Sequence, residues 1–80
     1  MKRIKNVKPL ENYKLLVEFE NGEKRIKDMM PYLEKGVFTK LKNKDFFNSV
    51  KLAYGTVCWG EDIDLCADSI YETSSSYNEK

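Results

Sequence analysis

The chain has 80 residues and a formal net charge of only +1, with 14 Lys and Arg against 13 Asp and Glu. It contains no histidine, which excludes Ser–His and Cys–His nucleophile activation and leaves its two cysteines without the further ligands that structural zinc needs. It has neither an apolar run of about 18 residues nor the apolar region of a signal peptide, so we expect a cytoplasmic protein that does not span a membrane.

The first predicted element is a strand over Arg3–Lys8 that Pro9 ends. Its alternation of polar and apolar residues is poor. We therefore place it at an edge of the sheet, where Lys and Arg side chains discourage pairing with other chains.

A β-hairpin is predicted next. The apolar residues of Tyr13–Phe19 recur at every second position, which is typical of a half-buried strand. Asn21-Gly22 follows, and this pair favours a two-residue type I′ turn. Such a turn predicts that Val17 lies opposite Ile26 on the core face, with Arg25 on the solvent face.

Short helical turns are predicted between the first hairpin and a second one. Asp28 is expected to cap a turn over Met29–Leu33, and Asp45 to cap a turn over Phe46-Phe47. Met29-Met30 is interpreted as gap-filling core rather than an adaptable docking surface.

A second hairpin is predicted around a type II′ turn at Gly55-Thr56. This turn places Tyr54 opposite Val57 and Leu52 opposite Trp59, all on one face. The three residues Leu52, Tyr54 and Trp59 could line a ligand pocket, but we interpret Trp59 as the anchor of the core, the more usual role of a lone tryptophan in a small domain.

An acidic cluster follows the second hairpin and consists of Glu61, Asp62, Asp64 and Asp68. Counting from Asp62, the sixth position is Ala67, where a calcium loop of the EF-hand type requires glycine. No nucleophile or base accompanies these carboxylates, so we expect neither a metal site nor general acid–base catalysis. Instead, Asp64 or Asp68 is expected to cap a last helical turn carrying Ile70 and Tyr71.

The two cysteines, Cys58 and Cys66, are expected to be free thiols, because nothing indicates export to an oxidising compartment. We therefore predict no disulfide, no bound metal, no cofactor and no catalytic residue.

Seven basic residues lie on the neighbouring predicted strands: Lys2, Arg3, Lys5, Lys8, Lys24, Arg25 and Lys27. With Tyr13 available to stack on a base, they suggest nucleic-acid binding. The isoelectric point of 7.7 argues against this interpretation, because nucleic-acid-binding domains more often exceed about 9. A solvated, lysine-rich strand edge is the preferred interpretation.

The order of landmarks from Ile4 to Tyr71 resembles a family of small, mostly bacterial proteins catalogued as domain of unknown function 2442. The residues that carry the resemblance are Tyr13-Lys14-Leu15, Phe19, Asn21-Gly22-Glu23, Asp28, Pro31, Leu33, Gly36, Phe38, Leu41, Asp45, Phe47, Gly55, Val57, Trp59, Asp64-Leu65, Asp68 and Ile70-Tyr71. The resemblance implies an α+β domain of antiparallel strands with short helices. It implies no established activity and no catalytic residue, but it does imply a neighbouring small protein as partner, in an antitoxin-like pair.

These observations predict an α+β fold, with a small antiparallel sheet built from two hairpins that turn at Asn21-Gly22 and Gly55-Thr56, and short helices between and after them. Residues 1–72 are expected to form a single domain and residues 73–80 a polar, frayed tail. We expect a non-enzymatic module that binds a protein partner in an antitoxin-like or regulatory role; nucleic-acid binding by the lysine-rich strands is the alternative.

Charge along the chain also predicts association. Residues 1–51 hold thirteen Lys and Arg against seven acids, whereas residues 52–80 hold one Lys against six acids. If folding keeps the two halves on separate faces, the molecule is complementary to itself, and weak, salt-dependent self-association follows.

Overall fold

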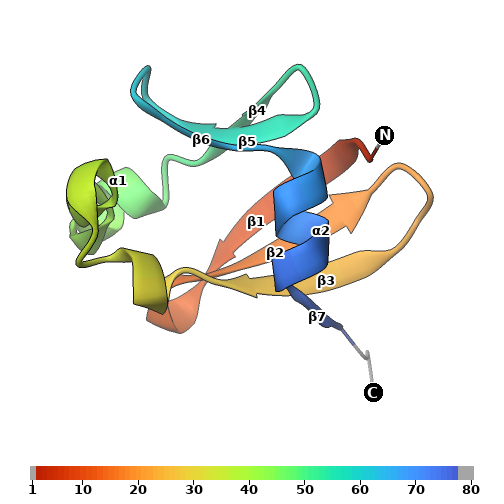
Figure 1. Ribbon diagram of the computed structural model, residues 1–80, viewed down its shortest axis with the longest axis horizontal. Helices are drawn as coiled ribbons and strands as arrows, with labels where there is room; N and C mark the ends of the chain where they lie inside the picture. Colours follow the sequence, from red (N-terminus) through yellow and green to blue (C-terminus); the bar gives the residue numbers. More distant parts are fainter. Residues whose placement is uncertain (1, 78–80) are drawn as a thin grey trace.

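The computed structural model describes residues 2–77, in which the strands form two antiparallel sheets (Figure 1). The first sheet has the order β1-β2-β3-β7 and consists of β1 (Ile4–Leu10), β2 (Lys14–Phe19), β3 (Lys24–Asp28) and β7 (Ser75–Ser76). The second has the order β4-β5-β6 and consists of β4 (Lys51–Ala53), β5 (Thr56–Trp59) and β6 (Ile63–Leu65). The predicted α+β class is confirmed, and the two predicted hairpins lie in separate sheets.

The helical segments are short. Three 3₁₀ segments, η1 (Glu11–Tyr13), η2 (Met30–Tyr32) and η3 (Gly36–Lys42), and two α-helices, α1 (Lys44–Phe47) and α2 (Ala67–Thr73), connect or follow the strands. Figure 1 shows α2 lying across one face of the four-stranded sheet, with the three-stranded sheet beside β1. None of the helices in this part of the chain is long and apolar enough to cross a membrane.

The core lies between the face of the first sheet that α2 covers, the second sheet and the helical segments. Its largest fully buried side chains are Trp59, Phe19, Leu15, Met29, Leu41, Ile70, Val17 and Val57. Trp59 stacks on Phe47 with ring centroids 6.0 Å apart, and its Nε1 donates a hydrogen bond to the Phe47 carbonyl over 2.9 Å. The interpretation of Trp59 as the core anchor is therefore confirmed. Met29 is core as predicted, but the prediction is wrong for Met30, whose side chain is 52% exposed.

The register of the first hairpin differs from the prediction by one residue. Val17 lies opposite Arg25, and Leu16 lies opposite Ile26. The loop has three residues rather than two, because the Phe19 amide donates to the Glu23 carbonyl over 2.8 Å and only Gly22 in the loop has a positive φ, of +90°. A type I turn completed by a left-handed glycine is the common three-residue alternative to type I′.

This change of register reverses the faces of β3. A shift of one residue moves every side chain of a strand to the other side of its sheet. Arg25 and Lys27 therefore face α2 and the core, where solvent-facing positions were predicted, and Ile26 faces outward.

The second hairpin also turns at a different place. Leu52 lies opposite Val57, and the two turn residues are Tyr54 and Gly55, with φ of +55° and +79°. The predicted Gly55-Thr56 turn is wrong, since Thr56 is the first residue of β5. Trp59 lies opposite Ile63 of β6, a strand that the sequence analysis did not predict.

None of the predicted aspartates is the N-cap residue of a helical segment. The Asp28 carboxylate does accept a hydrogen bond from the Met30 amide over 2.9 Å at the start of η2, but the N-cap position of η2 is Met29. At α1, however, Asn43 is the cap, because its side chain accepts from the Phe46 amide, and Asp45 lies within the first turn. Neither Asp64 nor Asp68 caps α2, whose N-cap is Cys66.

Both ends of the chain contain more strand than predicted. At the N-terminal end, β1 continues through Pro9 to Leu10; it is an edge strand, where proline is tolerated. In the stretch predicted to be a frayed tail, Thr73 ends α2 and Ser75-Ser76 pairs with Arg25 and Ile26 of β3. Residues 78–80 of that stretch lie outside the described residues.

Candidate functional site

The basic patch predicted on the first strands is divided by the fold. Arg25 donates from Nε to the Ser74 hydroxyl and from Nη2 to the Ser74 carbonyl, each over 2.7 Å. Lys27 is only 3% exposed, and its Nζ donates to the Tyr32 hydroxyl over 2.8 Å and to the Thr73 hydroxyl over 2.7 Å. Both cations thus lie at the C-terminal end of α2, where positive charge is favourable. They hold the helix on the sheet and are not free to contact phosphates.

Other members of the predicted patch also have structural contacts. Lys2 Nζ lies 4.1 Å from the Tyr71 ring centroid, and Arg3 forms an ion pair with Glu20 over 3.6 Å. Tyr13, the predicted base-stacking residue, packs edge-on against Phe47 and donates its hydroxyl to the Lys42 carbonyl over 2.6 Å. Tyr13, the last residue of η1, therefore acts as a structural contact to η3 and α1.

A polar cluster joins α2 to the first hairpin. The Tyr71 hydroxyl donates to Glu23 over 2.9 Å, and Arg25 pairs with the other oxygen of the same carboxylate over 2.8 Å. These hydrogen bonds hold the pKa of Glu23 below its ordinary value, and the bond from Tyr71 has the largest effect. The bond to Glu23 in turn raises the pKa of Tyr71.

The cluster predicts how stability depends on pH. A lowered carboxyl pKa in the folded state means that Glu23 stabilises the fold above the ordinary glutamate pKa, about 4.3, and that this contribution is lost as pH falls through its lower folded value. Tyr71 has the opposite sign, with a contribution present below its ordinary pKa, about 10, and lost as pH rises through the folded value. Urea midpoints should fall less on acidification from neutral pH for Glu23→Gln than for the unchanged protein. Equal losses in the two proteins would contradict this role of Glu23.

The predicted acidic cluster does not converge on one point. Asp62 pairs with Lys40 over 3.0 Å, and Asp68 accepts from the Lys2 amide over 2.9 Å. Glu61 and Asp64 are exposed, with Asp64 opposite Cys58 in the second sheet. Within residues 2–77, no group of three or more Cys, Asp or Glu side chains is arranged to hold a metal ion.

The contacts of Asp62 and Asp68 also test whether the basic residues 1–51 and the acidic residues 52–80 lie on separate faces. Lys40 belongs to the basic half of the chain and Asp62 to the acidic half, and Lys2 and Asp68 likewise come from opposite halves. At these two places the halves meet within one molecule. The two halves are therefore not kept on fully separate faces, which was the condition for the self-association predicted from charge.

Both cysteines are unbridged. Cys58 is buried in β5, whereas Cys66 is exposed at the start of α2.

The most unusual surface residue is Tyr54, in the tip of the second hairpin. It is 97% exposed, and its φ of +55° is rare for an aromatic residue. Arg3 lies beside the tip, because a Cβ atom on Gly55 would be 3.4 Å from Arg3 Nε, and the Ile4 amide donates to the Gly55 carbonyl over 3.2 Å. We call this surface the Tyr54 tip. A hollow of about 160 Å³ there is lined by Lys2, Arg3, Tyr54, Gly55, Thr56, Cys66, Ala67 and Asp68.

Sequence reasoning missed the Tyr54 tip because it counted Tyr54 as a strand residue. The available signal was Gly55, since a turn one residue earlier also places a glycine at a position that requires positive φ. That turn pairs two apolar residues, Leu52 and Val57, directly across the sheet.

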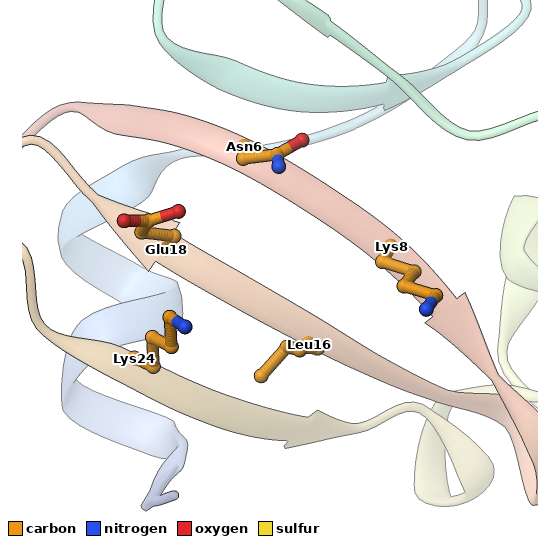
Figure 2. Close-up of a pocket in the computed structure, with 5 residues that line it drawn as sticks. All are labelled: Asn6, Lys8, Leu16, Glu18 and Lys24. Atoms are coloured by element: carbon orange, nitrogen blue, oxygen red, sulfur yellow. The ribbon is translucent and has the colours of Figure 1, made fainter.

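A second candidate surface is the side of the four-stranded sheet that faces away from α2. Figure 2 shows Asn6, Lys8, Leu16, Glu18 and Lys24 on this side, with α2 behind the sheet. These residues line a hollow of about 110 Å³. Leu16 and Ile26 are partly exposed here and lie directly opposite each other. We call this surface the outer face.

Comparison with known proteins identifies a family. A family model described as "Protein of unknown function (DUF2442)" matches residues 4–76. No curated protein and no solved structure matches the chain. The matched residues include all strands of the two sheets described above.

Proposed function

The chain belongs to the family of proteins of unknown function DUF2442, and from that premise we propose that it is a non-enzymatic, cytoplasmic module that binds a protein partner through the Tyr54 tip, in an antitoxin-like or regulatory role. The observation that carries this proposal is a nearly fully exposed tyrosine in a strained backbone conformation. The lack of histidine throughout the chain supports a role other than acid–base or nucleophilic catalysis.

Tyr54 contributes little to the fold. Its ring buries almost no apolar surface, so it gains almost nothing from the hydrophobic effect. A left-handed conformation costs a non-glycine residue about 1 kcal/mol, which asparagine largely avoids. A side chain that is neutral or unfavourable for folding is explained more readily by contact with another molecule.

Partner chemistry follows from the neighbours of Tyr54. Tyr and Arg are the residue types that most often dominate the energy of protein interfaces, and Arg3 lies beside this tyrosine. Lys2 and Arg3 outnumber the one acid, Asp68, among the residues that line the hollow. The surface therefore fits a partner with a recess for an aromatic ring and carboxylates around it.

Tyr54→Asn separates binding from folding. We expect this variant to be about 1 kcal/mol more stable in urea unfolding, because asparagine tolerates a positive φ, and to lose capture of the partner from an extract of the organism that encodes the chain. Tyr77→Asn is the matched control, since Tyr77 is also exposed, at 38%, and lies beside β3 of the first sheet, where its amide donates to the Lys24 carbonyl over 3.2 Å. The control should retain capture.

The outcomes of this experiment are distinct. A protein that binds the unchanged chain and Tyr77→Asn, but not Tyr54→Asn or Arg3→Ala, supports the proposal. Equal capture by all four proteins contradicts it. Binding that nuclease removes and that weakens steeply with salt would instead favour the alternative, nucleic-acid recognition by the lysine-rich strands.

A further inference from the structure

We propose that the outer face of the four-stranded sheet is an interface between two copies of this chain. The copies are related by a two-fold axis that runs parallel to the strands, between β2 and β3. This contact is separate from the Tyr54 tip, which belongs to the other sheet.

The outer face is a regular grid of side chains, because directly opposed residues of antiparallel strands point to the same side. At its centre, Leu16 of β2 lies opposite Ile26 of β3. At one end of these strands, Glu18 lies opposite Lys24, and at the other end Lys14 lies opposite Asp28. On the flanking strands, Lys8 of β1 is level with Leu16, and Ser75 of β7 is level with Ile26.

The four charges at the corners of this grid alternate in sign. On β2, Glu18 lies on one side of Leu16 and Lys14 on the other. On β3, Lys24 lies on one side of Ile26 and Asp28 on the other, so that Lys24 is beside Glu18 and Asp28 is beside Lys14. Within residues 2–77, none of these four side chains takes part in an intramolecular ion pair; the four pairs involve other acids. Lys14, Glu18 and Lys24 are thus available to a second molecule. Asp28 accepts from the Met30 amide through Oδ1 and keeps its other carboxylate oxygen for such a contact.

A grid with this alternation is complementary to itself. Rotation about the proposed axis places β2 of one copy over β3 of the other. Glu18 then faces Lys24, and Lys14 faces Asp28, each twice in the dimer. In the same arrangement Leu16 faces Ile26 at the centre, and Lys8 faces Ser75 at the rim, so no like charges are opposed. The contact has the features of an isologous interface, in which the same patch serves both copies.

The geometry of packed sheets permits this contact. Two sheets pack face to face about 10 Å apart with strands aligned within about 30°. The outer face is small and its apolar centre is limited to two side chains, so we expect a weak dimer with a dissociation constant on the order of 10–100 µM. The apolar pair contributes burial, while the charges set orientation and make the dimer salt-dependent.

The test uses charge reversal and sedimentation equilibrium from about 10 µM to about 1 mM, a range that brackets a weak dissociation constant. Glu18→Lys alone and Lys24→Glu alone each oppose like charges twice, so each should raise the dissociation constant at least about tenfold. A mixture of the two variants should form a heterodimer at least as tight as the unchanged homodimer, because the lysine introduced into one copy then faces the glutamate introduced into the other. A fluorescent label on the exposed Cys66 of one variant, away from the outer face, reports this mixed species.

The mixture of the two variants is the decisive measurement. If a charge reversal reduced dimerisation only because it destabilised the fold, mixing it with a second destabilised variant would not restore the dimer. Circular dichroism melts show whether each variant is folded, and Leu16→Lys provides a second way to disrupt the interface. Tyr54→Asn should leave the dimer unchanged, so failure of the partner proposal and failure of this one are distinguishable.

Two results would overturn the proposal. One is a monomer at every protein and salt concentration, including a monomer that binds another protein on this face. The other is a dimer whose dissociation constant is the same in the single variants as in the unchanged chain.

Discussion

Replacing Trp59 with alanine is expected to unfold the domain at ordinary temperature. Trp59 is fully buried, stacks on Phe47 and donates its Nε1 hydrogen to the Phe47 carbonyl. Removing so large a side chain costs about 3–5 kcal/mol in lost burial and residual cavity. An 80-residue domain has a total stability on the order of 5 kcal/mol, so little would remain.

Circular dichroism melting and urea titration check this prediction, with Trp59→Phe as control. Phenylalanine retains much of the burial but leaves the Phe47 carbonyl without its donor, so we expect an intermediate loss of about 1–2 kcal/mol. A Trp59→Ala protein that melts like the unchanged chain would show that the indole does not anchor the core.

The second large effect concerns the buried ammonium of Lys27. Its hydrogen-bond acceptors on other side chains are the hydroxyls of Tyr32 and Thr73. The double variant Tyr32→Phe/Thr73→Val removes both acceptors and leaves the charge buried, which we expect to cost about 3 kcal/mol in urea unfolding. Lys27→Met should cost much less, because an apolar side chain of similar length needs no acceptor.

The triple variant, with Lys27→Met added to the double, isolates the interaction. If the loss of stability in the double variant comes from the unsatisfied ammonium, the triple variant should recover most of that loss. The coupling free energy between Lys27→Met and the double variant should then be well above the deviation from additivity that is seen for independent sites. No recovery would mean that the two hydroxyls stabilise the domain through other contacts, such as the bond from Thr73 to the Ser69 carbonyl.

Local sequence patterns were sufficient to predict several features of the fold. The period of two in Tyr13–Phe19 correctly predicted which side chains of β2 are buried, since Leu15, Val17 and Phe19 all lie in the core. Asn21-Gly22 correctly placed a turn, and the lone tryptophan correctly indicated the core. In each case the decisive interaction is local or depends only on burial, so neighbouring residues carry the information.

The faces of β3 could not be predicted in this way. Asn21-Gly22 is compatible with loops of two or three residues, and the two choices place opposite faces of the strand toward the core. The three-residue loop brings Arg25 to Ser74 and Lys27 to Thr73, residues 49 and 46 positions away in the sequence. The packed positions of α2 and η2 distinguish the two registers, because Thr73, Ser74 and Tyr32 offer carbonyl and hydroxyl acceptors to these cations.

By itself, the sequence determined the α+β class, the edge position of the first strand, the burial pattern of β2 and the role of Trp59. Tertiary structure alone decided the exposure of Tyr54, the pairing of β6 and β7, and the alternating charges of the outer face. The physical reason is the range of the interactions concerned. Burial and turn propensity act on adjacent residues, whereas register, and with it the composition of each surface, depends on hydrogen bonds and packing between segments far apart in the chain.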